Sequence, residues 1–270
     1  MKRTTKTDIF QIIDSEEKAY WLGFIYADGS VDKYNKRLKV GVSITDIEHL
    51  EKLKHFLNHN RPFYFSKEKI FNKEKDFLCK PMVCLCVYSV EIYNSLQVFG
   101  IVPNKTNNFC LDLSRISEHL HLHFWRGMID GDGCVVLTDK SRVLQLTGHK
   151  KVCEMFLSFI KKYFETNVSV LKDKNVFCVK FSKTLASKIG KFFYENATIS
   201  LERKCDKAIK MTGKKNPVIK KPISVKINGI IENYESITNF CKLNSFNYKN
   251  VIYALNKHKK YLEYEFVSAT

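Results

Sequence analysis

Two stretches of this sequence follow one pattern: AYWLGFIYADGSV at residues 19–31 and HFWRGMIDGDGCV at residues 123–135. In each, a Gly stands two residues after a Trp, an apolar pair follows, and the stretch ends in Asp-Gly and a Val. The two acids are Asp28 and Asp132. A single apolar helix that stops at Asp-Gly is usually only a structural helix with a glycine stop. Two copies of this unusual peptide call for a shared explanation.

Small residues recur four positions apart in both stretches, and residues four apart share one face of a helix. We expect the two helices to pack against each other on these faces, which consist of Gly23, Ala27, Gly127 and Gly131. Their C-terminal ends would then coincide, and Asp28 and Asp132 would converge. Two neighbouring carboxylates repel each other. The pair therefore predicts a site for a hard divalent cation, Mg²⁺ or a similar ion such as Mn²⁺ or Ca²⁺.

The composition indicates a nucleic-acid partner. The 270 residues carry a formal net charge of +17, and 44% of them are hydrophobic, enough for a real core. A protein that is merely basic is the alternative interpretation. The nine Cys show neither a disulfide framework nor zinc-ribbon spacing, which favours reduced thiols inside a cell. With no signal peptide or membrane-spanning run evident, we expect an intracellular protein, in a phage-infected bacterium or an organelle.

The hydrophobic periodicity predicts two similar halves, residues 1–116 and 117–212. Each half is expected to run helix, two strands, helix, two strands, helix. After the first motif these elements are RLKVGVSI, DIEHLEKLKHFLNH, RPFYFSK, MVCLCVYS and EIYNSLQVFG; after the second they are SRVLQLTG, KKVCEMFLSFIKKYF, a hairpin in VSVLKDKNVFCVKFS, and TLASKIGKFFYEN. This order indicates an internal duplication within an α+β fold.

The last part of the chain differs in composition from the two halves. Residues 213–222 are rich in Lys and Pro and read as a linker. Residues 223–270 are expected to form a small basic domain, with a hairpin at Asn228-Gly229 and two short helices arranged as a helix-turn-helix. The expected DNA contacts of this domain lie near the start of its second helix: Lys242, Asn247, Tyr248 and Lys249. The alternative is a basic tail that adds affinity without specificity.

The segments WLGFIYADG and WRGMIDGDG resemble the two signature helices of LAGLIDADG homing endonucleases. The resemblance covers about residues 14–211. It implies a duplicated αββαββα fold whose two four-stranded sheets form a saddle over DNA. It also implies that Asp28 and Asp132 bind the catalytic metals with help from the carbonyls of Ala27 and Gly131. The family places a lysine late in each half, which corresponds here to Lys105 in PNKT and Lys204 in LERK.

The activity implied by the resemblance is metal-assisted hydrolysis of both strands of duplex DNA by a monomer, at a long, imperfectly palindromic site. A metal-activated water would attack each scissile phosphate, and Lys105 and Lys204 would position it and stabilise the transition state. Alternation along strands puts every second residue on the DNA face. The candidate contacts in the two halves are Lys33, Lys36, Arg37, Lys39, Arg61, Lys67, Lys140, Arg142, Gln145, Lys172, Lys174 and Lys180.

Other functions remain open from the sequence. A non-cleaving binder on the same fold, either an RNA maturase or a transcription regulator, is the main alternative. Both acids and both lysines are present, which favours the nuclease. The C-terminal domain resembles, more weakly, the modular DNA-binding repeats appended to intron-encoded and phage nucleases. An endonuclease embedded in a self-splicing protein is less expected, because the nucleophile and terminal Asn of such proteins are not found. One motif position departs from the family: the acid two residues before the catalytic one is kept as Asp130 but replaced by Tyr26 in the first copy.

Overall fold

The chain divides into two compact units, Met1–Gly213 and Lys214–Thr270. The computed structural model describes residues 5–66, 69–70, 78–79, 82–105, 109–213, 223–234, 237–246, 250–251, 260 and 262–267. Within these residues, no helix combines the length and the apolar character needed to cross a membrane.

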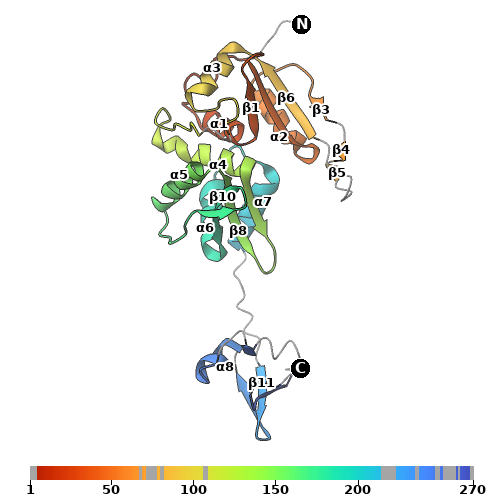
Figure 1. Ribbon diagram of the computed structural model, residues 1–270, viewed down its shortest axis with the longest axis vertical. Coiled ribbons are helices and arrows are strands. Elements are labelled where there is room, and N and C mark those ends of the chain that lie inside the picture. The colour runs from red at the N-terminus through yellow and green to blue at the C-terminus, as the bar shows by residue number, and fades with distance from the viewer. Residues whose placement is uncertain are drawn as a thin grey trace. The chain divides into compact units, whose positions relative to one another are not determined.

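The first unit begins with one run of helices and strands around a four-stranded antiparallel sheet (Figure 1). Its elements are α1 (Glu16–Asp28), β1 (Gly29–Asp32), β2 (Arg37–Ser43), the 3-10 turn η1 (Ile44–Asp46), α2 (Ile47–Phe56), β3 (Tyr64–Phe65), β4 (Lys69–Ile70), β5 (Leu78–Cys79), β6 (Met82–Tyr88) and α3 (Val90–Val98). The sheet order is β1-β2-β6-β3, and within the described residues β4 and β5 form a separate two-stranded ribbon. The β4–β5 ribbon is an addition that the hydrophobic pattern did not predict.

A second run of elements follows in the same unit. It comprises η2 (Glu118–Leu120), α4 (His121–Asp132), β7 (Gly133–Leu137), β8 (Arg142–Gly148), α5 (Lys150–Lys161), β9 (Leu171–Asp173), β10 (Val176–Ser182), α6 (Lys183–Tyr194) and α7 (Glu202–Gly213). Its sheet order is β7-β8-β10-β9, again antiparallel throughout. In both sheets the strand that directly follows the motif helix lies at one edge, beside the next strand in sequence. The mixed α+β class predicted from the sequence is confirmed.

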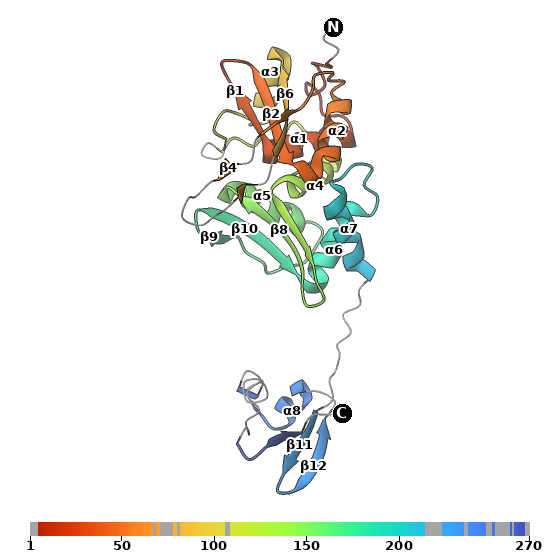
Figure 2. The same ribbon diagram turned by 90° about the vertical axis from the view of Figure 1, so that its right-hand side faces the viewer.

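Helices α1 and α4 lie side by side between the two sheets (Figures 1 and 2). Both are buried on nearly all sides, over residues 19–26 of α1 and 124–130 of α4. Trp21 and Trp125, at equivalent positions of the two motifs, are at most 1% exposed. The core therefore runs through the middle of the unit, and the two sheets flank it.

Glycines set the distance between α1 and α4. A Cβ atom added to Gly23 would lie 2.0 Å from the carbonyl oxygen of Phe124, and one added to Gly127 would lie 2.1 Å from that of Tyr20. Any side chain there would collide with the backbone of the opposite helix. The backbones of the two helices thus touch directly at these points, which fixes how the C-terminal ends of α1 and α4 meet.

The second unit contains a three-stranded antiparallel sheet, in the order β12-β11-β13, and the helix α8 (Ile237–Leu243). Strands β11 (Ile223–Ile227) and β12 (Ile230–Tyr234) are joined at Asn228-Gly229, where both φ angles are positive, as a two-residue hairpin requires. A small core forms around Val225, Phe240, Cys241 and Val251. Strand β13 (Glu265–Val267) was not predicted, because only its pairing with β11 identifies it. The predicted linker largely lies outside the described residues, as does most of the second predicted helix.

Candidate active site

Asp28 and Asp132 are the last residues of α1 and α4, where the two helix ends come together. A Cβ atom added to Gly131 would lie 2.3 Å from the Cβ of Ala27 and 3.4 Å from Oδ2 of Asp28. The Asp28 carboxylate therefore approaches the end of α4 closely. The four small residues predicted to form the helix interface all lie along this contact between α1 and α4.

The local electrostatics disfavour a second negative charge at this point. Desolvation and the charge of Asp132 raise the pKa of Asp28 to about 7, although Lys204 and Lys105 oppose the shift. Desolvation also raises the pKa of Asp132, against the same two lysines. The C-termini of two helices add partial negative charge at the same place. Such a site favours a bound cation.

Each helix end is met by one lysine from later in its own half. Lys105 donates a hydrogen bond from Nζ to the carbonyl oxygen of Gly29. Lys204 donates from Nζ to the carbonyl oxygen of Gly133 at 2.7 Å. Gly29 and Gly133 are equivalent residues, each directly after the motif acid. Both predicted lysines therefore reach the same position relative to their acids, even though they lie in unlike local segments.

Lys204 is held far more tightly than Lys105. Its side chain is 4% exposed, and Nζ also lies within hydrogen-bonding distance of three further carbonyl oxygens of α4, namely Ile129 at 2.9 Å, Asp130 at 2.7 Å and Gly131 at 3.2 Å. The last turn of a helix leaves such carbonyls without partners inside the helix. An ammonium group has three donors, so those of Lys204 are fully engaged in closing the end of α4.

Asp130 serves a different purpose from the acid pair. Its side chain is 1% exposed, and its carboxylate accepts hydrogen bonds from the hydroxyls of Tyr20 and Tyr194 and from the N–H of Leu201, each at 2.7 Å. Burial raises its pKa, while these three donors oppose the shift. Asp130 is thus enclosed by protein donors and is not directed at a ligand. The sequence identified it only as a motif position that differs between the two copies.

A cavity of about 240 Å³ opens beside Asp28. Its lining includes Ser43, Asp46, Gly131 and Arg203. Asp46 and Arg203 form a two-pronged ion pair, in which Nε and one terminal nitrogen of Arg203 each lie 2.8 Å from a carboxylate oxygen. This pair ties η1 of the first half to α7 of the second. Sequence reasoning missed it, because its partners are far apart in the chain and neither belongs to a motif.

The donor set fits a hard cation that keeps part of its hydration. Asp28 and Asp132 supply carboxylate oxygens, and Ala27 and Gly131 precede them at the helix ends. Among the described residues, no cluster of three or more His, Cys, Asp or Glu could enclose a metal. Mg²⁺ commonly binds through one or two carboxylates and completes its shell with water or phosphate oxygens. The residues present therefore suit Mg²⁺ better than a metal that needs a closed cage of side chains.

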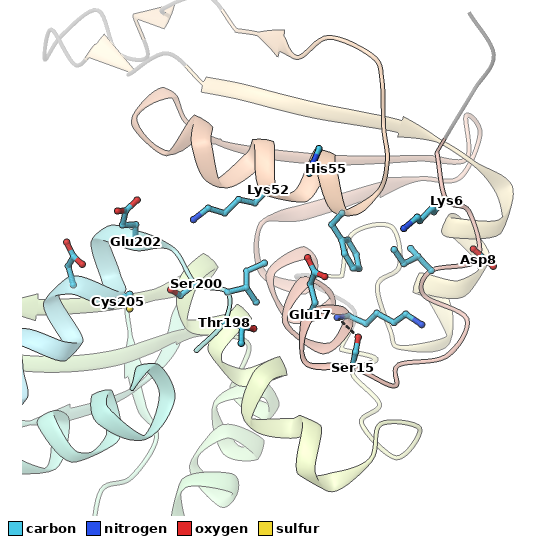
Figure 3. Close-up of a pocket in the computed structure, with 15 residues that line it drawn as sticks. Lys6, Asp8, Ser15, Glu17, Lys52, His55, Thr198, Ser200, Glu202 and Cys205 are labelled. Atoms are coloured by element: carbon cyan, nitrogen blue, oxygen red, sulfur yellow. Dashed lines mark hydrogen bonds between the residues drawn. The ribbon is translucent and has the colours of Figure 1, made fainter. Parts of the chain in front are cut away.

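A larger cavity lies away from the motif acids. It has a volume of about 1110 Å³ and lies at the N-terminal end of α1, where Ser15 caps the helix (Figure 3). Lys52, His55, Thr198 and Glu202 are among its lining residues (Figure 3). Asp28 lies at the opposite end of α1, and neither motif acid lines this cavity. Of the two cavities, only the smaller one is lined by a motif acid, Asp28.

The predicted DNA contacts fall into several groups. On the outer face of each sheet, which points away from the buried helices, strand positions are occupied by Arg37, Lys39, Gln145 and Lys180. The connections between strands carry the exposed residues Lys33, Lys140 and Lys174. Arg61 lies over the ring of Tyr88 at 5.7 Å, and Lys242 is exposed on α8. The predicted contacts Lys67, Asn247, Tyr248 and Lys249 lie outside the described residues.

Three of the predicted contacts do not lie on an outer face. Nζ of Lys36 is 4.4 Å from the ring centre of Tyr93 on α3. Arg142 donates a hydrogen bond to the hydroxyl of Ser187 on α6 at 3.5 Å, because it shares the face of β8 that carries the buried leucines. Lys172 pairs with Phe177, which packs against the core. Charge alone was an insufficient guide to the direction in which these side chains point.

Comparison with known proteins gives one sequence match. Residues 15–69 match the family described as LAGLIDADG-like domain. This segment contains α1 with its motif, but not α4. No curated protein matches the chain.

Several solved structures show a distant similarity to this chain. Full-length DUF199/WhiA from Thermatoga maritima is 15% identical, with a TM-score of 0.45, over 95% of this chain and 76% of that one. The I-LtrWI LAGLIDADG homing endonuclease bound to target DNA is 14% identical, with a TM-score of 0.44, over 77% of this chain and 91% of that one. The meganuclease I-SmaMI bound to uncleavable DNA is 15% identical, with a TM-score of 0.46, over 72% of this chain and 90% of that one. Similarity at this level carries no information about activity.

Proposed function

We propose that this chain is a site-specific homing endonuclease that hydrolyses phosphodiester bonds of duplex DNA with Mg²⁺. The observation that supports this best is the meeting of two motif acids at the ends of two packed helices, with one lysine on each end. The match of residues 15–69 to a LAGLIDADG-like domain agrees with it. The equal strand order of the two sheets supports an internal duplication, with one half for each side of the target.

The proposed roles follow from the geometry. Asp28 and Asp132 hold the cation, assisted by the carbonyls of Ala27 and Gly131, and the cation, when bound, supplies charge stabilisation and an activated water. Lys105 and Lys204 neutralise the negative helix ends and keep the acids in position. This differs from the role first expected for the lysines, since the donors of Lys204 are already engaged by carbonyl oxygens.

We propose that the outer faces of the two sheets contact the DNA as a monomeric saddle. Lys39, Gln145 and Lys180 are the strand residues best placed for base or phosphate contacts, because they alternate with buried residues. The second unit, with its basic composition and Lys242 exposed on α8, would add DNA contacts outside those of the saddle.

The test is cleavage of a randomised duplex library with Mg²⁺, followed by sequencing of the cut ends. We expect staggered cuts at one long, imperfectly palindromic site. Asp28→Asn and Asp132→Asn should each lower cleavage by at least about 10³-fold while DNA binding is kept. Asp206→Asn is a matched control, since Asp206 is an exposed acid on α7. Full cleavage by either motif variant would remove the site assignment.

A second candidate is a non-cleaving binder on the same fold, an RNA maturase or a transcription regulator. The engagement of Lys204 with backbone carbonyls favours it, because a lysine that only closes a helix end serves binding as well as cutting. DNA that the protein retains without cleavage in the library experiment would support this candidate. RNA retained in preference to DNA would identify the maturase.

A further inference from the structure

Asp130 holds the start of α7 through both its side chain and its main chain. Its Oδ2 accepts the N–H of Leu201 at 2.7 Å, and Leu201 in turn accepts the N–H of Lys204 at 2.9 Å in the first turn of α7. The carbonyl oxygen of Asp130 accepts the ammonium of the same Lys204 at 2.7 Å. One residue of α4 thus fixes the lysine from two sides.

The carboxylate is itself locked in place by both halves. Tyr194 of α6 donates to Oδ1 and Tyr20 of α1 donates to Oδ2, each at 2.7 Å. His49 of α2 continues the chain, with Nε2 2.9 Å from the Tyr20 hydroxyl. Hydrogen bonds to a buried carboxylate are stronger than neutral ones. The orientation of Asp130 is therefore set by α1, α2 and α6 together.

The first half has a different residue at the matching position. Two residues before Asp28 stands Tyr26, which is 6% exposed and packs near the ring of Phe124. A single hydroxyl cannot replace the two carboxylate oxygens that accept three hydrogen bonds around Asp130. Lys105 donates to the carbonyl of Gly29 and belongs to a turn that is closed by its N–H and the carbonyl of Val102 at 3.2 Å.

We propose that Asp130 is a positioning residue that sets Lys204 and not Lys105. This proposal rests on the endonuclease function for its consequence, a bias in the rate at which the two DNA strands are cut. The positioning of Lys204 by Asp130 does not depend on that function and can be measured without any DNA cleavage.

The first test measures the acetylation rate of Lys204 by mass spectrometry in the metal-free full chain, with Lys105 as internal reference. Tyr194→Phe removes one hydrogen bond to the carboxylate, so we expect acetylation of Lys204 about tenfold faster and Lys105 unchanged. Asp130→Asn should give a larger effect. Ser187→Ala is the control, because it removes a buried hydroxyl from the same helix α6 without contact to Asp130. An unchanged rate at Lys204 in folded Tyr194→Phe and Asp130→Asn protein overturns the proposal.

Global loosening is distinguished by the reference lysine. If Lys105 is acetylated faster by the same factor as Lys204, Asp130 only stabilises the fold and the positioning role is wrong. If Asp130→Asn does not fold, Tyr194→Phe decides alone, since it keeps the ring and loses one oxygen.

The second test follows both strands of the duplex recovered from the library experiment, labelled at each 5′ end. Asp130→Asn should slow the cutting of one strand about tenfold more than that of the other. Equal slowing of both strands overturns the one-sided action. If the wild-type protein does not cut DNA, the proposed endonuclease function is wrong. The acetylation experiment still tests whether Asp130 positions Lys204.

Discussion

The two ends of the paired helices are built from the same parts but are held differently. Asp28 and Asp132 each follow a small residue and precede a glycine, and each glycine carbonyl accepts a lysine ammonium. At α4 the lysine is buried and lies against four carbonyls, whereas Lys105 is bonded to one among the residues that the structure describes. A repeated motif thus conserves the position of a charge without conserving how firmly that charge is held.

The difference suggests a division of labour between the halves. The second half is fixed by the network of Asp130, Tyr20 and Tyr194, which also reaches into the first half. The end of α1 depends more on its contact with α4 than on a network of its own. The following predictions test this comparison, beginning with the change that should affect both halves most.

Gly23→Ala and Gly127→Ala should each destabilise the first unit by at least about 4 kcal/mol, because the new methyl group meets a backbone oxygen that cannot move alone. The effect should be similar for the two glycines, since each faces the backbone of the other helix. Urea unfolding would measure it. Gly148→Ala is the control and should be nearly neutral, because no atom lies within 4 Å of the added methyl group.

Lys204→Met should cost about 3 kcal/mol of folding free energy, since it leaves buried carbonyls of α4 and the Asp130 carboxylate without their cation. Lys105→Met should lower the free energy of unfolding by about 1 kcal/mol, because Lys105 is only partly buried. Thermal unfolding of both variants at pH 7 measures the contrast. Equal losses would mean that the two lysines are held alike.

Asp28→Asn should raise stability at pH 8 in the presence of a chelator. The pKa of Asp28 is raised from 3.8 to about 7, so the contribution of this group to wild-type stability is greatest below pH 4 and falls as the pH rises to 7. The variant lacks this decrease, so its free energy of unfolding at pH 8 should exceed that of the wild type by about 1 to 2 kcal/mol, after allowance for partial solvent exposure. Asp132→Asn should gain less, because its side chain is more exposed. Melting curves at pH 4 and pH 8 decide; a gain that is larger at pH 4 would contradict the prediction.

The residues directly before α2 and α5 make different contacts in the two halves, and we expect this difference to have the smallest energetic effect. Asp46 reaches Arg203 beside Lys204, whereas His149 stacks on Phe109 with ring centres 5.3 Å apart. We expect a coupling of about 1 kcal/mol for Asp46 with Arg203 in a double-mutant cycle, decreasing with salt. The stacked pair should show a similar coupling that salt does not change. A salt-independent coupling of Asp46 with Arg203 would refute the ionic assignment.

Much of this architecture could be predicted from local patterns. The two helices with their small-residue faces follow from the spacing of Gly23, Gly127 and Gly131, and the strands β2 and β8 follow from alternation of apolar residues. Lys105 and Lys204 were found through resemblance, since charge density alone does not single out two lysines among many. In each of these cases the deciding information lies within a short segment or a recurring motif.

The remaining features depend on contacts between distant residues. The roles of Asp130 and Arg203 require knowledge of which elements meet, since Tyr194, Leu201 and Asp46 are all remote in sequence. The direction of Arg142 was misjudged because its place in the alternation of β8, with the buried leucines, outweighs its charge. Strand β13 has no distinctive pattern and is identified only by its partner β11.

The direct backbone contact between α1 and α4 also has a consequence for synthesis of the chain. Asp132 follows Asp28 by 104 residues, so the apolar α1 leaves the ribosome long before its partner exists. At roughly 5 to 20 residues per second, that delay is about 5 to 20 s. Throughout this interval the nascent first half presents an unsatisfied apolar helix, a binding site for chaperones. Slowing translation between the two motifs should therefore lower the yield of active protein more than slowing it after Asp132.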